Sequence, residues 1–513
     1  MKLCFVNPSL RPGSATKYLP VGVAAVMTAV RRAGYEFDLL DIDIDDLDDA
    51  QVEEHFRRKA YDVVLAGSIV THYKWMKWLT RTVKRFQPAC RVVVGNSVGG
   101  SVPEVFLRNS AVDVVIIGEG EFSCIETLDA WRDGGDLAAV KGIAFLDGQG
   151  RFVQTPKRPA CKIDELPMVD WSFFDVERYF QKSYAGADGL IFDENNLPRV
   201  MPVATARGCV FRCTFCHFVF WDDPYRYRSP ENILAEIRRN IEKYQVNFIN
   251  FWDDLSFASL RQAERMADAI LASGLKFYWN AAVRTDLFGK DKFSYAERLA
   301  VARKLRESGC VNVGFSLESG NQAILDMMEK KVSADNFKEQ TRVLNEAGIS
   351  SSISVVFGYP IETADTIRET FEQCLDVGIY PSIGYLLPLP YTKMYEYARQ
   401  HGHIVDENAY LDGITERQDF CLNMTSMPTE EIEGLIKHYA GELNRMLKLG
   451  LSEGRLLRTG GYMYQKSESA ANPRKLLDPD NLKRQQNDVS LNYSQAVFKM
   501  EFVKPKREAA PQA

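Results

Sequence analysis

Short apolar segments alternate with helical segments in two separate blocks of this chain, residues 1–150 and 200–390. In the first block the apolar segments are brief and rich in β-branched residues, which is typical of strands buried on both faces. The expected strands are 2–7, 37–41, 62–66, 91–95 and 112–117. This alternation predicts a doubly wound, Rossmann-like α/β domain with a parallel sheet.

The second block repeats the strand and helix alternation six times. Its expected strands are 201–205, 247–252, 276–283, 311–317, 351–357 and 379–386. Helices are expected between them at 230–244, 260–273, 296–308, 334–347 and 363–377. Six such units predict a partial (β/α)6 barrel within residues 200–392, with its reactive groups at the carboxyl ends of the strands.

The other segments differ in composition. Residues 151–199 are rich in proline, which interrupts regular structure, so we expect a packed linker there. Residues 393–464 carry helical patterns and are expected to form a small helical C-terminal domain. The polar residues 465–513 are expected to form a poorly ordered tail.

Composition excludes several classes of protein. The 513 residues carry a net charge of −6, so nothing indicates a nucleic-acid-binding surface. No apolar run approaches the roughly 18 residues that a membrane span requires, and the first residues lack a signal-peptide pattern. We therefore expect a cytoplasmic protein without a membrane span.

Three thiols lie close together after the first expected strand of the barrel: Cys209, Cys213 and Cys216. Soft thiolate ligands suit iron-sulfur clusters, and one short loop keeps the three sulfurs close enough to converge. Three thiolates can hold three irons of a 4Fe-4S cube, which leaves the fourth iron without a protein ligand. Because a substrate can coordinate an open iron, the spacing favours a cluster that takes part in chemistry.

Two other interpretations of these thiols remain open. His217 could complete a structural zinc site with them, although such sites usually pair ligands from two separated units. The three cysteines could also be core residues that lie close together by chance. The remaining cysteines are scattered and are expected to be free thiols in a reducing compartment.

The three-cysteine motif, with Phe215 before its last cysteine, resembles the cluster motif of the radical S-adenosylmethionine (SAM) superfamily. In that family the open iron binds the amino and carboxylate groups of SAM, and reduction cleaves SAM to a 5′-deoxyadenosyl radical. The resemblance implies SAM contacts at successive strand ends of the barrel. The SAM-binding residues that it implies are Phe215, Asp253, Asp254, Arg284, Glu318, Phe357 and Gly358.

Three loops of the first block follow expected strands and are rich in glycine, which lets the backbone approach a bulky ligand. Because they precede the three-cysteine motif, they resemble the cobalamin-binding domain of cobalamin-dependent radical SAM enzymes. The cobalamin-binding residues that this resemblance implies are Ser68, Thr71, Gly95, Asn96, Gly118, Glu119, Gly120 and Glu121. The chain lacks the Asp-x-His-x-x-Gly motif that supplies an axial histidine in some of these domains, so no such ligand is expected, and His72 is interpreted as an ordinary loop residue.

The family resemblance implies three cofactors: a 4Fe-4S cluster, SAM and cobalamin. The expected activity is methyl transfer to an unactivated carbon of a small-molecule or lipid substrate, with a reductant protein such as flavodoxin or ferredoxin as partner. One departure from the family lies in the segment Pro388-Leu389-Pro390-Tyr391-Thr392, where Tyr391 replaces the usual glycine. No catalytic acid or base can be assigned.

Three alternatives stay open at this point. An enzyme with the same cofactors could oxidise, cyclise or rearrange its substrate without methyl transfer, because the substrate pocket decides the fate of the radical. A non-catalytic cobalamin or iron-sulfur sensor is a second possibility. Methylthiolation of tRNA is a weaker third, because the chain is acidic and has no recognisable RNA-binding module.

Overall fold

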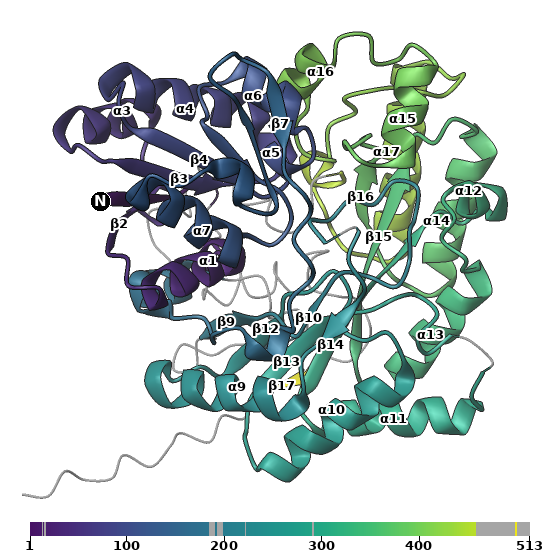
Figure 1. Ribbon diagram of the computed structural model, residues 1–513. Coiled ribbons are helices and arrows are strands. Elements are labelled where there is room, and N and C mark those ends of the chain that lie inside the picture. The colour runs from purple at the N-terminus through teal and green to yellow at the C-terminus, as the bar shows by residue number, and fades with distance from the viewer. Residues whose placement is uncertain are drawn as a thin grey trace, which may run out of the picture.

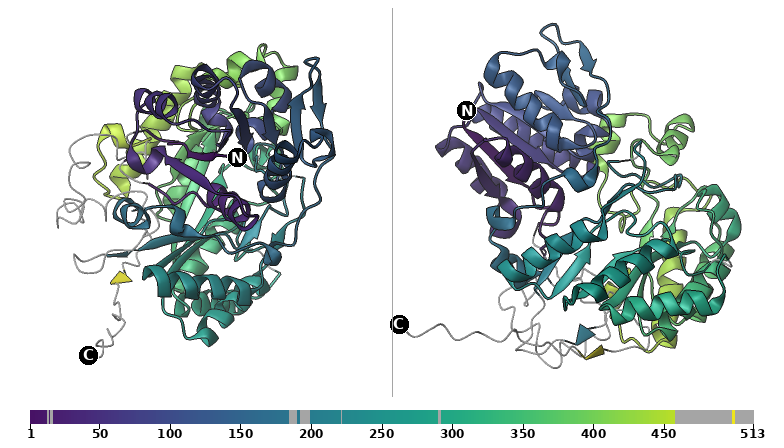
Figure 2. Two further views of the ribbon diagram at one scale, coloured as in Figure 1. Left: turned by 60° about the vertical axis from the view of Figure 1, so that its left-hand side comes forward. Right: turned by 60° about the horizontal axis from the view of Figure 1, so that its bottom comes forward.

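The computed structural model describes residues 1–12, 14, 17–183, 190–191, 199–220, 222–289, 292–457 and 498–499. Two parallel sheets dominate it, and they lie in two domains that face each other (Figures 1 and 2). The predicted tail at 465–513 lies almost wholly outside the described residues. Among the helices that are described, none is both long and apolar enough to cross a membrane.

The N-terminal sheet has the strand order β2-β1-β3-β4-β5-β6-β7. Its first five strands in sequence pair in parallel: β1 (Leu3–Asn7), β2 (Phe37–Asp41), β3 (Val63–Gly67), β4 (Arg91–Gly95) and β5 (Val114–Ile116). These strands confirm the predicted doubly wound domain. The sequence analysis missed the antiparallel strands β6 (Ile143–Leu146) and β7 (Phe152–Gln154), and the predicted domain boundary at residue 150 falls in the turn between them.

Helices cover both faces of this sheet (Figure 1). On one face, α1 (Val21–Arg32) packs against α7 (Gly120–Asp133), and their buried side chains join one large core with those of the barrel. The other face carries α3 (Asp49–Arg58), α4 (Tyr73–Phe86), α5 (Ser97–Gly100) and α6 (Pro103–Asn109), whose core is separate. The short α2 (Ile42–Asp45) follows β2. The face with α1 and α7 is therefore the one turned toward the barrel.

The second sheet has the order β16-β15-β14-β13-β12-β9, with every pair parallel. Its six strands are β9 (Val200–Val203), β12 (Phe248–Phe251), β13 (Tyr278–Ala282), β14 (Cys310–Glu318), β15 (Ser350–Phe357) and β16 (Ser382–Tyr385). The intervening helices are α9 (Pro230–Tyr244), α10 (Leu260–Ser273), α11 (Tyr295–Glu307), α12 (Gln322–Met327), α13 (Ala334–Glu346) and α14 (Ala364–Asp376). The sheet confirms the predicted partial barrel.

Side-chain caps explain why the barrel helices begin where they do. Ser294, Ser333 and Thr363 each accept a hydrogen bond from a backbone N–H in the first turn of the helix that follows, while the third helical residue bonds back to the cap. Such capping boxes satisfy N–H groups that would otherwise lack a partner at a helix start. They fix where each strand-to-helix loop ends, and these loops carry the site described below.

The chain after the barrel returns to the N-terminal domain. Helix α15 (Lys393–Gln400) and helix α16 (Glu407–Gly413) follow β16, and α16 packs against α4 and α6. Helix α17 (Thr429–Met446) packs against α14. The segment before the barrel holds α8 (Val176–Lys182), and its fully buried Tyr179 bonds to Asp41 of the N-terminal domain.

Candidate functional site

The three clustered cysteines lie on the loop that follows the first strand of the barrel. After β9, residues Ala206–Arg207 form the short strand β10, which pairs antiparallel with β11 (Arg226–Tyr227). Gly208 then takes a φ of +80°, a conformation that glycine adopts without strain, and turns the chain toward Cys209. The cluster loop therefore begins directly after a pair of hydrogen-bonded strands, which fixes the position of its first residues.

Thr214 anchors the middle of this cluster loop. Its N–H donates to the Met328 carbonyl at 2.9 Å, and its own carbonyl accepts the Met394 N–H at 3.0 Å. Its hydroxyl donates to the Met327 carbonyl at 3.1 Å and lies 3.3 Å from the buried Tyr359 hydroxyl. Contacts from three separate elements therefore hold the position of the thiols.

The donor set fits a cluster better than a single ion. All three thiols are half-buried, and burial raises the pKa of each of them. Among the residues that the structure describes, no three His, Cys, Asp or Glu side chains surround one position where a single metal ion could sit. Three thiolates that bind three different irons do not need to converge on one point.

His217, next to the last thiol, contacts the N-terminal domain. Its Nε2 lies 3.0 Å from the Ser101 hydroxyl, and burial lowers its pKa to about 4. Its other ring nitrogen, Nδ1, is buried without a hydrogen-bond partner among the described residues. The zinc alternative is disfavoured because His217 and the thiols do not form a group of three donors around one position in the described part of the chain.

The paired aspartates after β12 play different parts. Asp253 accepts hydrogen bonds from the Thr205 N–H at 2.7 Å, the Thr205 hydroxyl at 2.6 Å and the Ala206 N–H at 2.9 Å, so it fixes the start of the cluster loop. Both Asp253 and Asp254 line the cavity described below, but only Asp253 is held by these three hydrogen bonds. Removal from bulk water and the neighbouring Asp253 charge raise the pKa of Asp254 to about 6. Of the two predicted candidates, Asp254 has the carboxylate with room for a ligand.

Three charged side chains lie at the ends of β13 and β14. The sequence analysis identified Arg284 and Glu318 but not Lys330. Arg284 lies with its guanidinium 3.2 Å from the ring centre of Phe211, in the cluster loop, and donates to the Lys330 carbonyl at 2.7 Å. Glu318 has a φ of +65° and pairs with Lys330 at 2.8 Å. Lys330 was not predicted, because it lies after α12 and only the fold brings it to Glu318.

The remaining predicted SAM contacts differ in exposure. The ring of Phe215 packs edge-on to that of Tyr359, with centroids 6.3 Å apart. The side chain of Phe357 is buried in the core. Gly358 has a φ of +96°, and its N–H donates to Glu362 at 3.1 Å. Burial raises the pKa of Glu362 to about 7, and this carboxyl, which was not predicted, supports the loop after β15.

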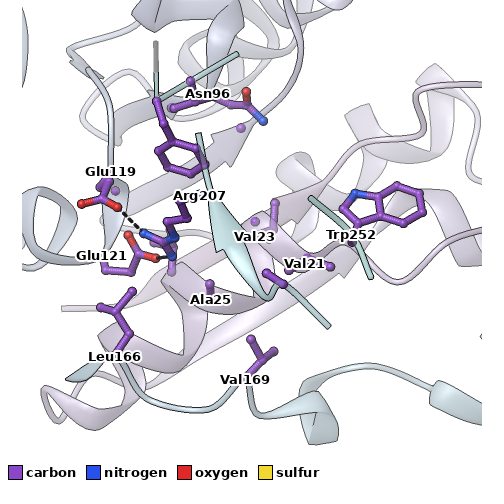
Figure 3. A pocket seen from close by; sticks show the side chains of 18 of the residues that line it. Val21, Val23, Ala25, Asn96, Glu119, Glu121, Leu166, Val169, Arg207 and Trp252 are labelled. Carbon is purple, nitrogen blue, oxygen red and sulfur yellow. Dashed lines mark hydrogen bonds and ion pairs between the residues drawn. The ribbon is translucent and has the colours of Figure 1, made fainter. Parts of the chain in front are cut away.

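A cavity of about 590 Å³ lies between the two domains, at the carboxyl ends of both sheets (Figure 3). Gly67, Gly95 and Gly118 line it where β3, β4 and β5 end. A Cβ added at Gly95 would meet only the Ile116 side chain, at 3.7 Å, and one added at Gly118 would meet nothing within 4 Å. Protein packing and backbone conformation do not explain the missing side chain at Gly95, whereas the φ of +79° at Gly118 itself favours glycine. The loops leave room for a large ligand and so fit cobalamin.

The other predicted cobalamin residues fall into two groups. Asn96, which has a φ of +66°, and Gly120 line the cavity. Ser68 and Thr71 do not line it, and the Ser68 hydroxyl instead lies 3.0 Å from His72 Nδ1. The ring of His72 stacks on Trp75, which agrees with its interpretation as an ordinary loop residue.

Glu119 and Glu121 line the cavity with their carboxylates turned to the barrel domain (Figure 3). Glu119 pairs with Arg207 at 2.6 Å and with Arg226 at 2.9 Å, and Glu121 also pairs with Arg207. These carboxylates therefore have protein partners, which the sequence analysis did not foresee.

Tyr391 has a left-handed backbone conformation, which glycine adopts without strain. Its φ is +75°, which is strained for a residue with a Cβ. Its ring lies 6.2 Å from that of His217, and its hydroxyl donates to Asp222 at 3.3 Å.

We expect Tyr391→Gly to be more stable than Tyr391→Ala by about 1 kcal/mol, because both lose the ring but only glycine relieves the backbone. Urea unfolding of the two variants measures the difference. Equal stabilities would show that the backbone at residue 391 is not strained.

Comparison with known proteins identifies the two domains. Residues 203–374 match the radical SAM superfamily, and residues 14–126 match the B12 binding domain. An uncharacterised methyltransferase of Pyrococcus horikoshii is 25% identical over 78% of this chain and 83% of its own length. The anaerobic magnesium-protoporphyrin IX monomethyl ester cyclase of Cereibacter sphaeroides is 25% identical over 80% of this chain, but the match spans only 66% of the cyclase.

Among solved structures, that of the radical SAM methyltransferase TsrM from Kitasatospora setae, with cobalamin and a 4Fe-4S cluster bound, is similar with a TM-score of 0.62. The match covers 79% of this chain and 78% of TsrM at 17% identity. At that identity, the likeness shows a common fold. It agrees with the two-domain arrangement described above.

Proposed function

We propose that this chain, which belongs to the cobalamin-dependent radical SAM enzymes, transfers a methyl group to an unactivated carbon of a small-molecule or lipid substrate. The observation that carries the proposal is the shared cavity. Its wall joins the glycine loops of the B12-binding domain to Asp254 at a strand end of the radical SAM domain. A substrate held there would lie between the two cofactor sites.

The proposal gives each group of residues a role. Cys209, Cys213 and Cys216 would hold the cluster, and the glycine loops would hold cobalamin. Asp254 would accept the ammonium group of SAM, because a carboxylate forms a strong charge-assisted hydrogen bond with it in a dry cleft. Arg284 and Lys330 would supply positive charge for the carboxylate of SAM.

The cavity wall suits radical chemistry. Most lining residues are apolar, and the lining cations Arg207 and Arg228 are both paired with glutamates. Among the described residues, Asp253 and Asp254 are the lining carboxylates without a cationic partner, so the charge that the wall offers a ligand is gathered at the end of β12. A mostly apolar wall favours exclusion of water, which protects a reactive intermediate from side reactions.

The choice of methyl transfer follows from the chemistry of the acceptor. An ordinary SAM-dependent methylase needs a nucleophile, and an sp³ carbon is not one. With its cofactors bound, the enzyme has a radical source to remove a hydrogen atom and a methyl source to replace it. The names of the Pyrococcus relative and of TsrM, both methyltransferases, support this choice.

The experiment uses SAM with a deuterated methyl group and a protein-free small-molecule extract. The anaerobically loaded and reduced enzyme should yield 5′-deoxyadenosine together with a product that has gained one methylene and carries the label. Formation of 5′-deoxyadenosine with an unlabelled product would contradict methyl transfer. It would instead favour the second candidate, a cyclisation or oxidation, which the match to the cyclase supports.

A further outcome distinguishes the third candidate, a non-catalytic cofactor sensor. If reduced enzyme with full iron and cobalt content never forms 5′-deoxyadenosine, catalysis itself is contradicted.

For the active enzyme we propose a flavodoxin or ferredoxin as electron donor and no nucleic-acid partner, in a cytoplasmic setting. Replacement of chemical reductant by purified flavodoxin and its reductase tests the donor.

A further inference from the structure

Four charged side chains form an ionic bridge between the two domains, next to both proposed cofactor loops. Two of them, Glu119 and Glu121, come from the start of α7, directly after Gly118. The other two, Arg207 and Arg226, lie opposite each other on the paired strands β10 and β11. We call these four residues the interdomain bridge.

The contacts of the bridge converge on one arginine. Arg207 reaches Glu119 with one terminal nitrogen at 2.6 Å and Glu121 with the other. Arg226 approaches the same Glu119 oxygen at 2.9 Å, and the second Glu119 oxygen accepts the Cys161 N–H at 3.1 Å. Figure 3 shows both glutamates pointing at Arg207 on the wall of the cavity.

Burial makes these contacts strong. The side chains of Glu119 and Glu121 are only 5% and 6% exposed, and that of Arg207 is 14% exposed. Charges removed from water interact strongly and leave a costly unpaired partner when one member is lost. The like charges of Arg207 and Arg226 face each other across two strands, so the Glu119 carboxylate between them also holds β10 and β11 together.

The interdomain bridge is adjacent in sequence to both proposed cofactor loops. Arg207 comes two residues before Cys209, while Glu119 comes directly after the cavity-lining Gly118. The short chain on either side links the bridge to the first cluster thiol and to the glycine loop. A change in the bridge therefore shifts one loop relative to the other.

We propose that the interdomain bridge sets the separation and orientation of the cluster loop relative to the cobalamin loop, with Arg207 and Glu121 as positioning residues. The proposal rests on the proposed function in one respect, because it requires both cofactors in one chain. It assigns no chemical step to these four residues. They fix the distance over which the substrate must reach from the cluster to the cobalt.

The first test measures that distance in Glu121→Gln. Pulsed electron paramagnetic resonance of anaerobically loaded protein gives the distance distribution between the reduced cluster and cob(II)alamin. Glu126→Gln is the control, because Glu126 lies on the same helix and pairs with Arg158, in the segment after β7, instead of with the barrel. We expect a narrow distribution in wild type and in the control, and a broadened or shifted one in Glu121→Gln and Arg207→Gln, each measured on the molecules that carry both metals.

A second test needs no metal and so remains decisive if a variant loads poorly. In the cofactor-free full-length chain, amide hydrogen exchange over residues 206–212 should be about tenfold faster in Glu121→Gln than in wild type or Glu126→Gln, because one charged anchor is lost. Arg207→Lys, which keeps the charge but has one ammonium group in place of two terminal nitrogens, should restore only part of the protection that Arg207→Gln loses.

The outcomes separate the two proposals. Equal distance distributions and equal exchange in all variants would overturn the bridge and leave the proposed function intact. Wild-type protein that binds iron but no cobalt would overturn the proposed function, whereas the exchange measurement on cofactor-free protein would still judge the bridge.

Discussion

We expect a Cys213→Ala variant to retain about one cobalt per chain but less than about one iron, where the wild type should hold about four. The expected loss is large because Cys213 is one of three protein ligands, and two thiolates do not hold a cube against reductant and chelator. The cobalt stays because the B12-binding domain has its own sheet and its own buried core on the far face. Metal analysis after anaerobic reconstitution with iron, sulfide and hydroxocobalamin gives both numbers.

Cys421→Ala provides the control for this experiment. Cys421 is also a half-buried free thiol, but it lies far along the chain from the cluster loop. We expect it to keep both metals and to form 5′-deoxyadenosine, which the Cys213→Ala variant cannot do. Full iron content in Cys213→Ala would refute the assignment of the cluster.

The second large effect is expected from Gly95→Phe, which should lose cobalt and keep iron. The backbone admits a side chain here, because Gly95 is not among the glycines with positive φ and its nearest neighbour would be the Ile116 side chain at 3.7 Å. The phenyl ring would instead occupy the cavity that the glycine loops leave open. Cobalt content should fall below about a tenth of the wild-type value, because a ring in a preformed pocket displaces the ligand.

Gly148→Phe controls for the added ring. Gly148 lies exposed in the turn between β6 and β7, where an added Cβ meets nothing within 4 Å. That variant should bind both cofactors. The cluster of Gly95→Phe should still cleave SAM after reduction, so 5′-deoxyadenosine without product would separate the two halves of the site. Normal cobalt content in Gly95→Phe would place cobalamin elsewhere.

The strands of the two parallel arrays could be predicted because each is a short apolar run bounded by turn residues. β2, β4, α9 and α10 have the bounds that their apolar periodicity and turn residues predict. The β6–β7 hairpin escaped prediction because it extends the parallel sheet with two antiparallel strands, and its residues lie where the alternation of strands and helices has ended.

The sequence predicted which residues lie at strand ends, but it did not predict which of them contact each other. The position after β12 identified the aspartate pair, and both line the cavity, but the sequence could not show that Asp253 would be bound to Thr205. Glu119 and Arg207 lie 88 residues apart, and nothing local to either indicates the other. Lys330 was missed for the same reason, since the fold alone brings it beside Glu318.

The glycine loops show the opposite case. Their glycines were identified from the chain because glycine after a strand indicates a close approach of the backbone to a ligand. Gly67, Gly95, Gly118 and Gly120 all line the cavity. Ser68, in the same loop as Gly67, turns to His72 instead, because alternate residues beyond a strand end point to opposite sides.

The most direct test of the whole account is the metal content of the wild-type chain. Protein purified without oxygen, reconstituted and incubated with hydroxocobalamin should retain about four irons and about one cobalt per chain after desalting, with the absorbance of both cofactors. Iron without cobalt would contradict the account, because the cavity between the two domains would then hold something other than cobalamin, and the methyl-transfer proposal would lose its methyl source.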